Sequence, residues 1–83
     1  MNYNLRYTKK AIKDLKKLDK FTNLMIKSWI DSNLKNCSDP RSTGKALKGN
    51  KSGLWRYRIG SYRIICEIKD EELIILALQI GHR

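Results

Sequence analysis

Apolar side chains occupy every second position from residue 3 to residue 7, and this period of two predicts a half-buried strand over residues 2–7. Thr8 then suits a helix N-cap, and Tyr7 before it could pack on Ile12 as a hydrophobic staple. Beyond the cap the apolar residues recur every three or four positions, which predicts a helix. The residues expected on its buried face are Ala11, Ile12, Leu15 and Leu18.

A second stretch with helical spacing follows the polar break at Asp19-Lys20 and closes before Asp39-Pro40, because the residue before a proline disfavours the helical conformation. Two short helices joined this tightly predict a helical hairpin. The polar segment of residues 41–51 is expected to be a loop or connector with one helical turn at residues 45–48. The second helix is expected to bury the stripe of Phe21, Leu24, Met25, Ser28 and Trp29.

Three strands are predicted in the second half of the chain. Leu54–Ile59 and Tyr62–Ile68 are joined by Gly60-Ser61, and glycine in the first position of a two-residue link suits a type II′ hairpin turn. After a polar turn at residues 69–72, the almost continuously apolar Leu73–Ile80 should form a central strand. The order βααβββ predicts an α+β domain in which an antiparallel sheet packs against the helical hairpin.

The two-residue link also determines which residues of the hairpin face each other. Arg58 is expected opposite Arg63, and Arg56 opposite Ile65. Directly opposed residues share a face of the sheet, so the three arginines are expected on one face. The other face, against the helices, would carry Trp55, Tyr57, Ile59, Tyr62, Ile64 and Cys66.

The charge of the chain indicates a polyanionic partner, because 18 Lys and Arg stand against 8 Asp and Glu, a formal net charge of +10. Nucleic acid, an acidic protein and an anionic membrane surface would all satisfy this charge. From Pro40 to Cys66 there are seven basic residues and no acidic one. Opposed arginines destabilise a sheet by up to ~1 kcal/mol, so an anion is expected between Arg58 and Arg63. Guanidiniums bind phosphate bidentately, which favours a phosphodiester.

Cys37 and Cys66 lie far apart in the sequence, without the spacing of a zinc site, and are expected to be free thiols in a reducing cytosol. No metal ion or other cofactor is expected. The N-terminus lacks the apolar region of a signal peptide, and no apolar run approaches the ~20 residues of a membrane span. These features predict a cytoplasmic protein without a membrane partner.

Four short motifs carry a family resemblance: Leu47-Lys48-Gly49, Trp55-Arg56-x-Arg58, Gly60-x-Tyr62-Arg63 and Gly81-His82-Arg83. They resemble the RelE branch of the RelE/ParE superfamily of type II toxin–antitoxin toxins. The resemblance implies an endoribonuclease that enters the ribosomal A site and cuts the mRNA there, which inhibits translation. It also implies an acidic RelB-like antitoxin as partner, with operator DNA bound only by the toxin–antitoxin complex.

The resemblance also implies roles for individual basic residues. Arg63 is assigned to the phosphate that is attacked. Relatives often have lysines where this chain has Arg56 and Arg58, and an arginine essentially cannot lose its proton, so a lysine-type general base is in doubt. His82, the only histidine, is either an acid–base group or an exposed bystander. The residues expected to be catalytic are Arg56, Arg58, Arg63, His82 and Arg83, and those expected to bind RNA are Lys45, Lys48 and Lys51.

Two alternatives differ in class from the nuclease. One is a ParE-type inhibitor of DNA gyrase, although binding alone does not require this set of arginines. The other is a catalytically weakened or non-enzymatic protein that binds antitoxin and operator DNA. Relatives usually continue past the position of Arg83 with residues that include an aromatic, so reduced cleavage is expected of a single domain spanning residues 1–83. The lysines of the first helix could form a solvated face or contact ribosomal RNA or an acidic antitoxin helix.

Overall fold

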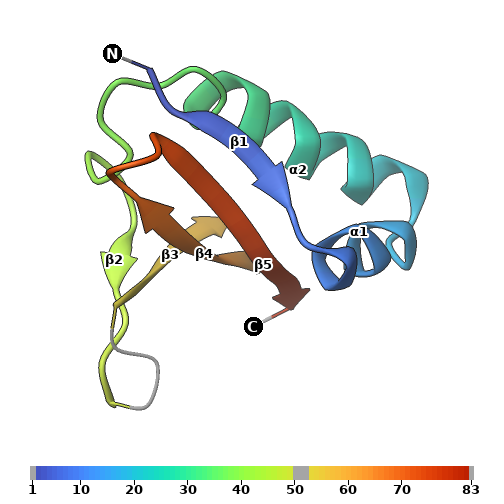
Figure 1. Cartoon of the computed structure of the whole chain (residues 1–83). Coiled ribbons are helices and arrows are strands. Elements are labelled where there is room, and N and C mark those ends of the chain that lie inside the picture. Colours follow the sequence, from blue (N-terminus) through green and yellow to red (C-terminus); the bar gives the residue numbers. More distant parts are fainter. Residues whose placement is uncertain (1, 50–52, 83) are drawn as a thin grey trace.

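A five-stranded sheet carries both helices on one of its faces in the computed structural model, which describes residues 2–49 and 53–82 (Figure 1). Within these residues the chain forms the predicted order of elements, with one short strand added. The elements are β1 (Asn4–Tyr7), α1 (Lys9–Lys16), α2 (Lys20–Asn33), β2 (Lys45–Ala46), β3 (Leu54–Ile59), β4 (Tyr62–Lys69) and β5 (Ile74–His82).

The strands lie side by side in the order β1-β5-β4-β3-β2. Neighbouring strands are antiparallel except for β1 and β5, which run parallel from the pair Asn4 and Ile74 to the pair Tyr7 and Ala77. The prediction of an α+β domain is confirmed. The prediction of an antiparallel sheet was wrong for the pair of β1 and β5 and right for the other neighbours. Parallel neighbours need a long connection between them. The two helices and three strands that separate β1 from β5 in the sequence provide it. As predicted, β5 has a neighbour on both sides.

Both helices begin at a polar capping residue, Thr8 as predicted and Asp19 from the predicted polar break. Thr8 accepts a hydrogen bond from the backbone N–H of Ala11 at 3.1 Å, and Asp19 accepts one from the N–H of Thr22 at 3.1 Å. These side chains satisfy N–H groups that have no partner within the first turn of a helix. The Thr8 hydroxyl also donates to the carbonyl of Leu78 at 2.9 Å, which ties the start of α1 to β5.

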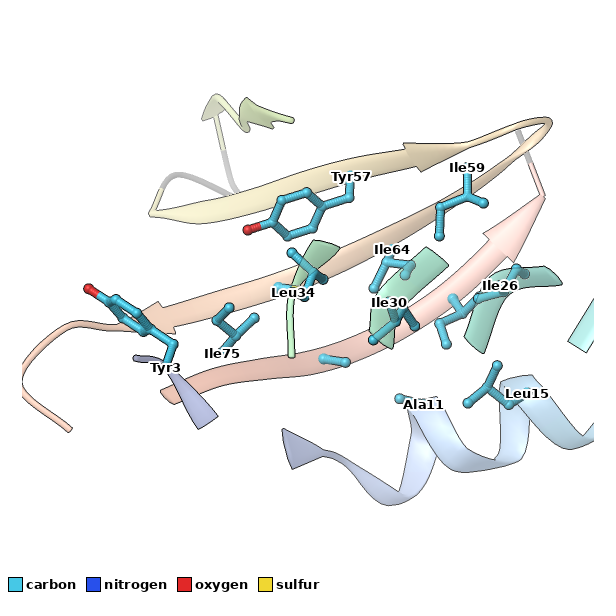
Figure 2. Close-up of a cluster of buried hydrophobic side chains, with 13 residues drawn as sticks. Tyr3, Ala11, Leu15, Ile26, Ile30, Leu34, Tyr57, Ile59, Ile64 and Ile75 are labelled. Carbon is cyan, nitrogen blue, oxygen red and sulfur yellow. The ribbon is translucent and has the colours of Figure 1, made fainter. Parts of the chain in front are cut away.

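The core lies between the sheet and the helices, where Tyr57 and Ile64 from the hairpin meet Ile26 and Ile30 from α2 (Figure 2). Every predicted pair of the hairpin is confirmed, including Arg58 opposite Arg63. The faces are confirmed as well, because the predicted inner residues are buried or packed against the core. Gly60 has φ +58, the positive value that a primed turn needs at this position.

The face that α2 turns to the core differs from the predicted one. Ile26 and Ile30 are buried, whereas the side chains of Phe21, Leu24 and Met25 are 76%, 57% and 37% exposed. Apolar residues occupy two neighbouring stripes of this helix, and periodicity does not distinguish them. Trp29 of the predicted stripe does pack against the core beside Tyr57, while Phe21, Leu24 and Met25 remain outside.

The predicted helical turn at residues 45–48 was wrong, because Lys45–Ala46 forms strand β2 against β3. The preceding Gly44 explains how the two backbones approach. It has φ +82, and a Cβ there would lie 2.5 Å from the carbonyl oxygen of Arg56. Pairing with the exposed edge of β3 satisfies backbone groups that an isolated helical turn would leave to water.

Neither cysteine takes part in a disulfide; Cys37 is half-buried and Cys66 is buried. Burial in the core raises the pKa of the Cys66 thiol to about 12. Within residues 2–49 and 53–82, no helix is long and apolar enough to cross a membrane. The same residues contain no group of three His, Cys, Asp or Glu side chains placed to hold a metal ion.

Candidate functional site

The face of the sheet opposite the helices carries two rows of paired residues. In one row Arg58 of β3 pairs with Arg63 of β4, and Arg63 pairs with Gly81 of β5. In the other row Arg56 pairs with Lys45 of β2 on one side and with Ile65 of β4 on the other. Directly paired residues share a face, so four basic side chains come to the same side of the sheet. This basic face is defined here as Lys45, Arg56, Arg58 and Arg63.

A hollow of about 320 Å³ opens where the ends of β4 and β5 meet α1. It is called the Arg63 hollow below. Its floor is apolar at the buried Ile65, while most of its wall is polar. The residues that line it are Lys10, Asp14, Arg63, Ile65, Gln79, Ile80, Gly81 and His82.

Arg63 is half-buried, and its Nε is buried without a hydrogen-bond partner among the described residues. A buried N–H of a charged group without an acceptor is costly, and the cost is removed when an anion supplies the acceptor. Arg58 lies directly opposite and adds a second positive charge. The pair therefore forms a site suited to a phosphate group.

His82 reaches the same hollow through the pairing of β4 with β5. Tyr62 pairs with His82, and Arg63 pairs with Gly81, so the histidine follows directly on the residue beside Arg63. The imidazole lies edge-on to the ring of Tyr62, with centroids 5.0 Å apart and planes at 88°. This aromatic contact helps to orient the exposed imidazole beside the hollow. By its pairing with Tyr62, His82 belongs to the face of the sheet toward the helices, while it also lines the Arg63 hollow at the end of β5; its acid–base role stays a prediction.

Arg56 and Arg58 line a second hollow, of about 230 Å³, at the edge of the sheet. Lys45, Gly44 and Tyr57 also line it. The three arginines thus share a face as predicted, but they do not line one common hollow. Arg63 and His82 line the first hollow, while Arg56 and Lys45 line the second.

Of the other predicted site residues, Lys48 is the one that the described part of the chain includes. Lys48 is exposed shortly after β2, and it lines neither hollow. Lys51 and Arg83 lie outside the described residues. Trp55 is half-buried and packs on the core, as predicted, and its Nε1 donates to the carbonyl of Thr43 at 2.7 Å.

Comparisons with known proteins agree with this fold. Residues 5–83 match the family of ParE toxins of type II toxin–antitoxin systems, parDE. The chain belongs to the RelE/ParE superfamily of toxins. It is 30% identical over 83 residues to toxin RelG of Mycobacterium tuberculosis, covering 93% of it, and 31% identical to a putative RelE-like toxin protein of Escherichia coli, covering 85%. Its fold is similar to that in the crystal structure of the toxin–antitoxin complex RelBE2 from M. tuberculosis, with a TM-score of 0.89 and 29% identity over 100% of this chain and 93% of that one.

Two residues of this RelE/ParE toxin that line the Arg63 hollow were not predicted from the sequence. Asp14 is only 9% exposed, accepts a hydrogen bond from the backbone N–H of Ile80 at 3.0 Å, and forms an ion pair with Lys10 at 2.9 Å. Burial alone would raise the pKa of the Asp14 carboxyl, but the bonds from Ile80 and Lys10 outweigh it and hold the pKa below its usual value. The sequence did contain a signal for this pair: Asp14 lies within the apolar stripe of α1, four positions after Lys10, where the two side chains can meet.

Proposed function

We propose that this toxin is a ribosome-dependent endoribonuclease that cuts mRNA in the A site and thereby inhibits translation. The observation that carries the proposal is Arg63, a half-buried guanidinium whose Nε lacks an acceptor among the described residues and which shares a hollow with a histidine. A phosphate oxygen would supply that acceptor through a charge-assisted bond, about twice as strong as a neutral one. The RelE-like relatives support the same class of reaction.

In the proposed reaction the ribose 2′-oxygen attacks the adjacent phosphorus while the bond from phosphorus to the 5′-oxygen of the next nucleotide breaks. The products are a 2′,3′-cyclic phosphate and a 5′-hydroxyl. Arg63 would stabilise the negative charge that grows on the non-bridging oxygens. Arg56 and Arg58 would bind neighbouring phosphates along the same face of the sheet.

The reaction also moves two protons, one from the 2′-hydroxyl and one to the departing 5′-oxygen. The arginines stay charged and are poor at either transfer. Asp14 is a weak base, because its neighbours hold the pKa of its carboxyl below the usual value. Imidazole exchanges protons near neutral pH, so we assign one of the two transfers to His82.

Gyrase inhibition is the second candidate function, because the matched family is described as that of the ParE toxins. An inhibitor of this kind acts by binding and needs no group that moves protons. Loss of toxicity in a variant that still folds and still binds its antitoxin would not separate the two functions. Assays on the two different targets, ribosome-bound mRNA and DNA gyrase, do distinguish them.

A RelB-type antitoxin is the proposed partner, since the similar RelBE2 structure is a toxin–antitoxin complex. The described surface offers it an apolar patch on the two helices, which we define as Ile12, Phe21, Leu24 and Met25. A hollow of about 210 Å³ between the helices adjoins this patch at Ile12, and Lys16 and Lys27 stand beside it. Apolar residues rimmed by lysines suit one side of an acidic amphipathic helix.

The deciding experiment adds the protein to ribosomes programmed with a defined mRNA and maps the 5′ ends of the fragments. The proposal expects a cut within the A-site codon, a cyclic phosphate on the upstream fragment and no cutting of the same RNA without ribosomes. In parallel, a gyrase supercoiling assay tests the second candidate. Inhibition of gyrase without any cleavage would replace the proposal.

Arg63→Ala is expected to lower the single-turnover cleavage rate by roughly 10²-fold or more, because it removes a group that binds the charge of the transition state. Arg63→Lys should recover only part of this loss, since lysine cannot form two parallel bonds to phosphate. Lys27→Ala, on the opposite side of the molecule, is the control and should cut normally. A cleavage rate unchanged by Arg63→Ala in a folded protein would refute the assignment.

A further inference from the structure

We propose that α1 takes part in the RNA site: Asp14 fixes the end of β5 that leads to His82, and Lys10 binds a phosphate of the RNA from the wall opposite Arg63. This inference rests on the proposed nuclease function and extends its site to residues outside the predicted motifs. It assigns Asp14 a positioning role and Lys10 a direct contact with the substrate.

The end of β5 needs an external support because its neighbour on one side stops short. β1 pairs with β5 only as far as Ala77, and the chain then turns away into α1. The pairing with β4 shifts by one residue at Ile65 and Cys66, so that Cys66 pairs with Ala77 while Ile65 pairs with Gln79. Such an irregularity bends a strand and changes the direction of the residues that follow. The last residues of β5 are therefore aimed away from β1.

Residues of α1 and its cap replace the missing strand. The N–H of Thr8 donates to the carbonyl of Ala77 at 3.0 Å, and the Thr8 hydroxyl donates to the carbonyl of Leu78 at 2.9 Å. Asp14 then accepts the N–H of Ile80 at 3.0 Å. The Asp14 bond is the last of the three and lies two residues before His82. A shift of this bond would move the imidazole relative to Arg63, and small displacements of reacting groups are costly to catalysis.

Lys10 lies beside the same hollow with its ammonium held in place. Its Nζ is 2.9 Å and 3.2 Å from the two carboxylate oxygens of Asp14, and the side chain is 63% exposed. An ammonium has three N–H donors, so at least one remains for a phosphate oxygen. The pair also explains how a carboxylate can line an RNA site, because Lys10 and the N–H of Ile80 compensate its charge.

A purely structural role for Asp14 is the competing interpretation, since an i,i+4 ion pair and a capped strand end can serve stability alone. The two roles predict different kinetics. A structural residue changes the unfolding temperature and leaves the rate per folded molecule unchanged. A positioning residue changes the maximal cleavage rate at temperatures where every variant is folded.

The test uses Asp14→Ala, Asp14→Asn and Lys10→Ala in the full chain, with Lys16→Ala as matched control on the same helix. Single-turnover cleavage on programmed ribosomes is measured at several toxin concentrations, and thermal unfolding is recorded for each variant. The Nε–H resonance of Arg63 is followed by NMR during titration with inorganic phosphate. This second measurement needs no cleavage, so it tests the inference even if the proposed function fails.

Lys10→Ala is expected to weaken phosphate binding and to raise the half-saturating toxin concentration, each by about three- to tenfold, through loss of one phosphate contact. Asp14→Ala should lower the maximal rate by about tenfold or more. The maximal rate of Asp14→Asn should lie between those of wild type and Asp14→Ala. The asparagine amide oxygen can still accept the N–H of Ile80, but the ion pair with Lys10 is lost. If Asp14→Ala does not fold, Asp14→Asn carries the test. Rates and phosphate binding equal to those of Lys16→Ala would overturn the inference.

Discussion

Gly44 shows how a single residue can decide the position of a neighbouring element. Its positive φ and the contact that a Cβ would make with Arg56 leave room for glycine alone. The close approach lets β2 pair with β3 and brings Lys45 beside Arg56 on the basic face. The sequence contains the glycine, but the need for it depends on a strand more than ten residues away.

Gly44→Ala is expected to destabilise the protein by about 2 kcal/mol or more, through left-handed backbone strain and the steric contact with β3. The matched control is Gly53→Ala, because Gly53 also has positive φ, at +92, but has open space around it. Chemical denaturation of both variants separates the two contributions. Equal destabilisation would mean that backbone strain accounts for the whole effect.

At the scale of elements, a polar cluster holds the turn between β4 and β5. Arg41 binds both carboxylate oxygens of Asp70, at 2.9 Å and 3.0 Å, and the Tyr3 hydroxyl donates to one of them at 2.6 Å. The bonds from Arg41 first, and then from Tyr3, lower the pKa of the Asp70 carboxyl to about 2. This cluster links the start of the chain, the connector after α2 and the turn, none of which is close in sequence.

The Asp70 cluster predicts a specific dependence of stability on pH. An unfolded aspartate has a pKa of about 3.9, so the stabilisation is fully present above that value and is lost as pH falls toward the folded pKa of about 2. Asp70→Asn should lower the melting temperature at pH 7, and the difference from wild type should close between about pH 4 and pH 2. Glu71→Gln, an exposed neighbour, is the control. A difference that persists unchanged at pH 2 would contradict this account.

The choice of face on α2 is also made at the scale of elements. Both stripes of this helix satisfy helical periodicity, and the one that is buried contains Ile26 and Ile30. Branched side chains have few rotamers and pack well in a core, and Figure 2 shows both isoleucines within the buried cluster. The stripe of Phe21, Leu24 and Met25 stays exposed and becomes available to a partner.

For the whole molecule, the basic face and the apolar patch lie on different surfaces. The basic face is on the sheet side away from the helices, while the apolar patch is on the helices themselves. The net charge of +10 favours polyanionic partners at either surface. The separation allows each surface to be altered without the other.

Phe21→Ser combined with Leu24→Ser is therefore expected to weaken binding of the cognate antitoxin by at least tenfold, because two exposed apolar anchors are lost. Folding and cleavage on ribosomes should stay close to wild type. Isothermal titration with the purified antitoxin gives the affinity, and Asp31→Ser, an exposed polar change on the same helix, is the control. Antitoxin affinity equal to that of the control would exclude this patch as its docking site.

Much of the fold could be predicted because it follows from local chemistry. The cap at Thr8, the hairpin register through Gly60-Ser61 and the shared face of the three arginines each depend on residues close in sequence or on the period of two. The family resemblance was likewise carried by short motifs. These features need no knowledge of distant contacts.

Other features depended on contacts between distant segments. The parallel pairing of β1 with β5, the exposed stripe of α2, strand β2 and the positions of Lys10 and Asp14 beside β5 each arise where one element meets another. By itself the sequence determined which side chains share a strand face, because alternation is a local property of the backbone. Only the tertiary structure decided which of them share a hollow, because that depends on how strand ends and helices meet across the sheet.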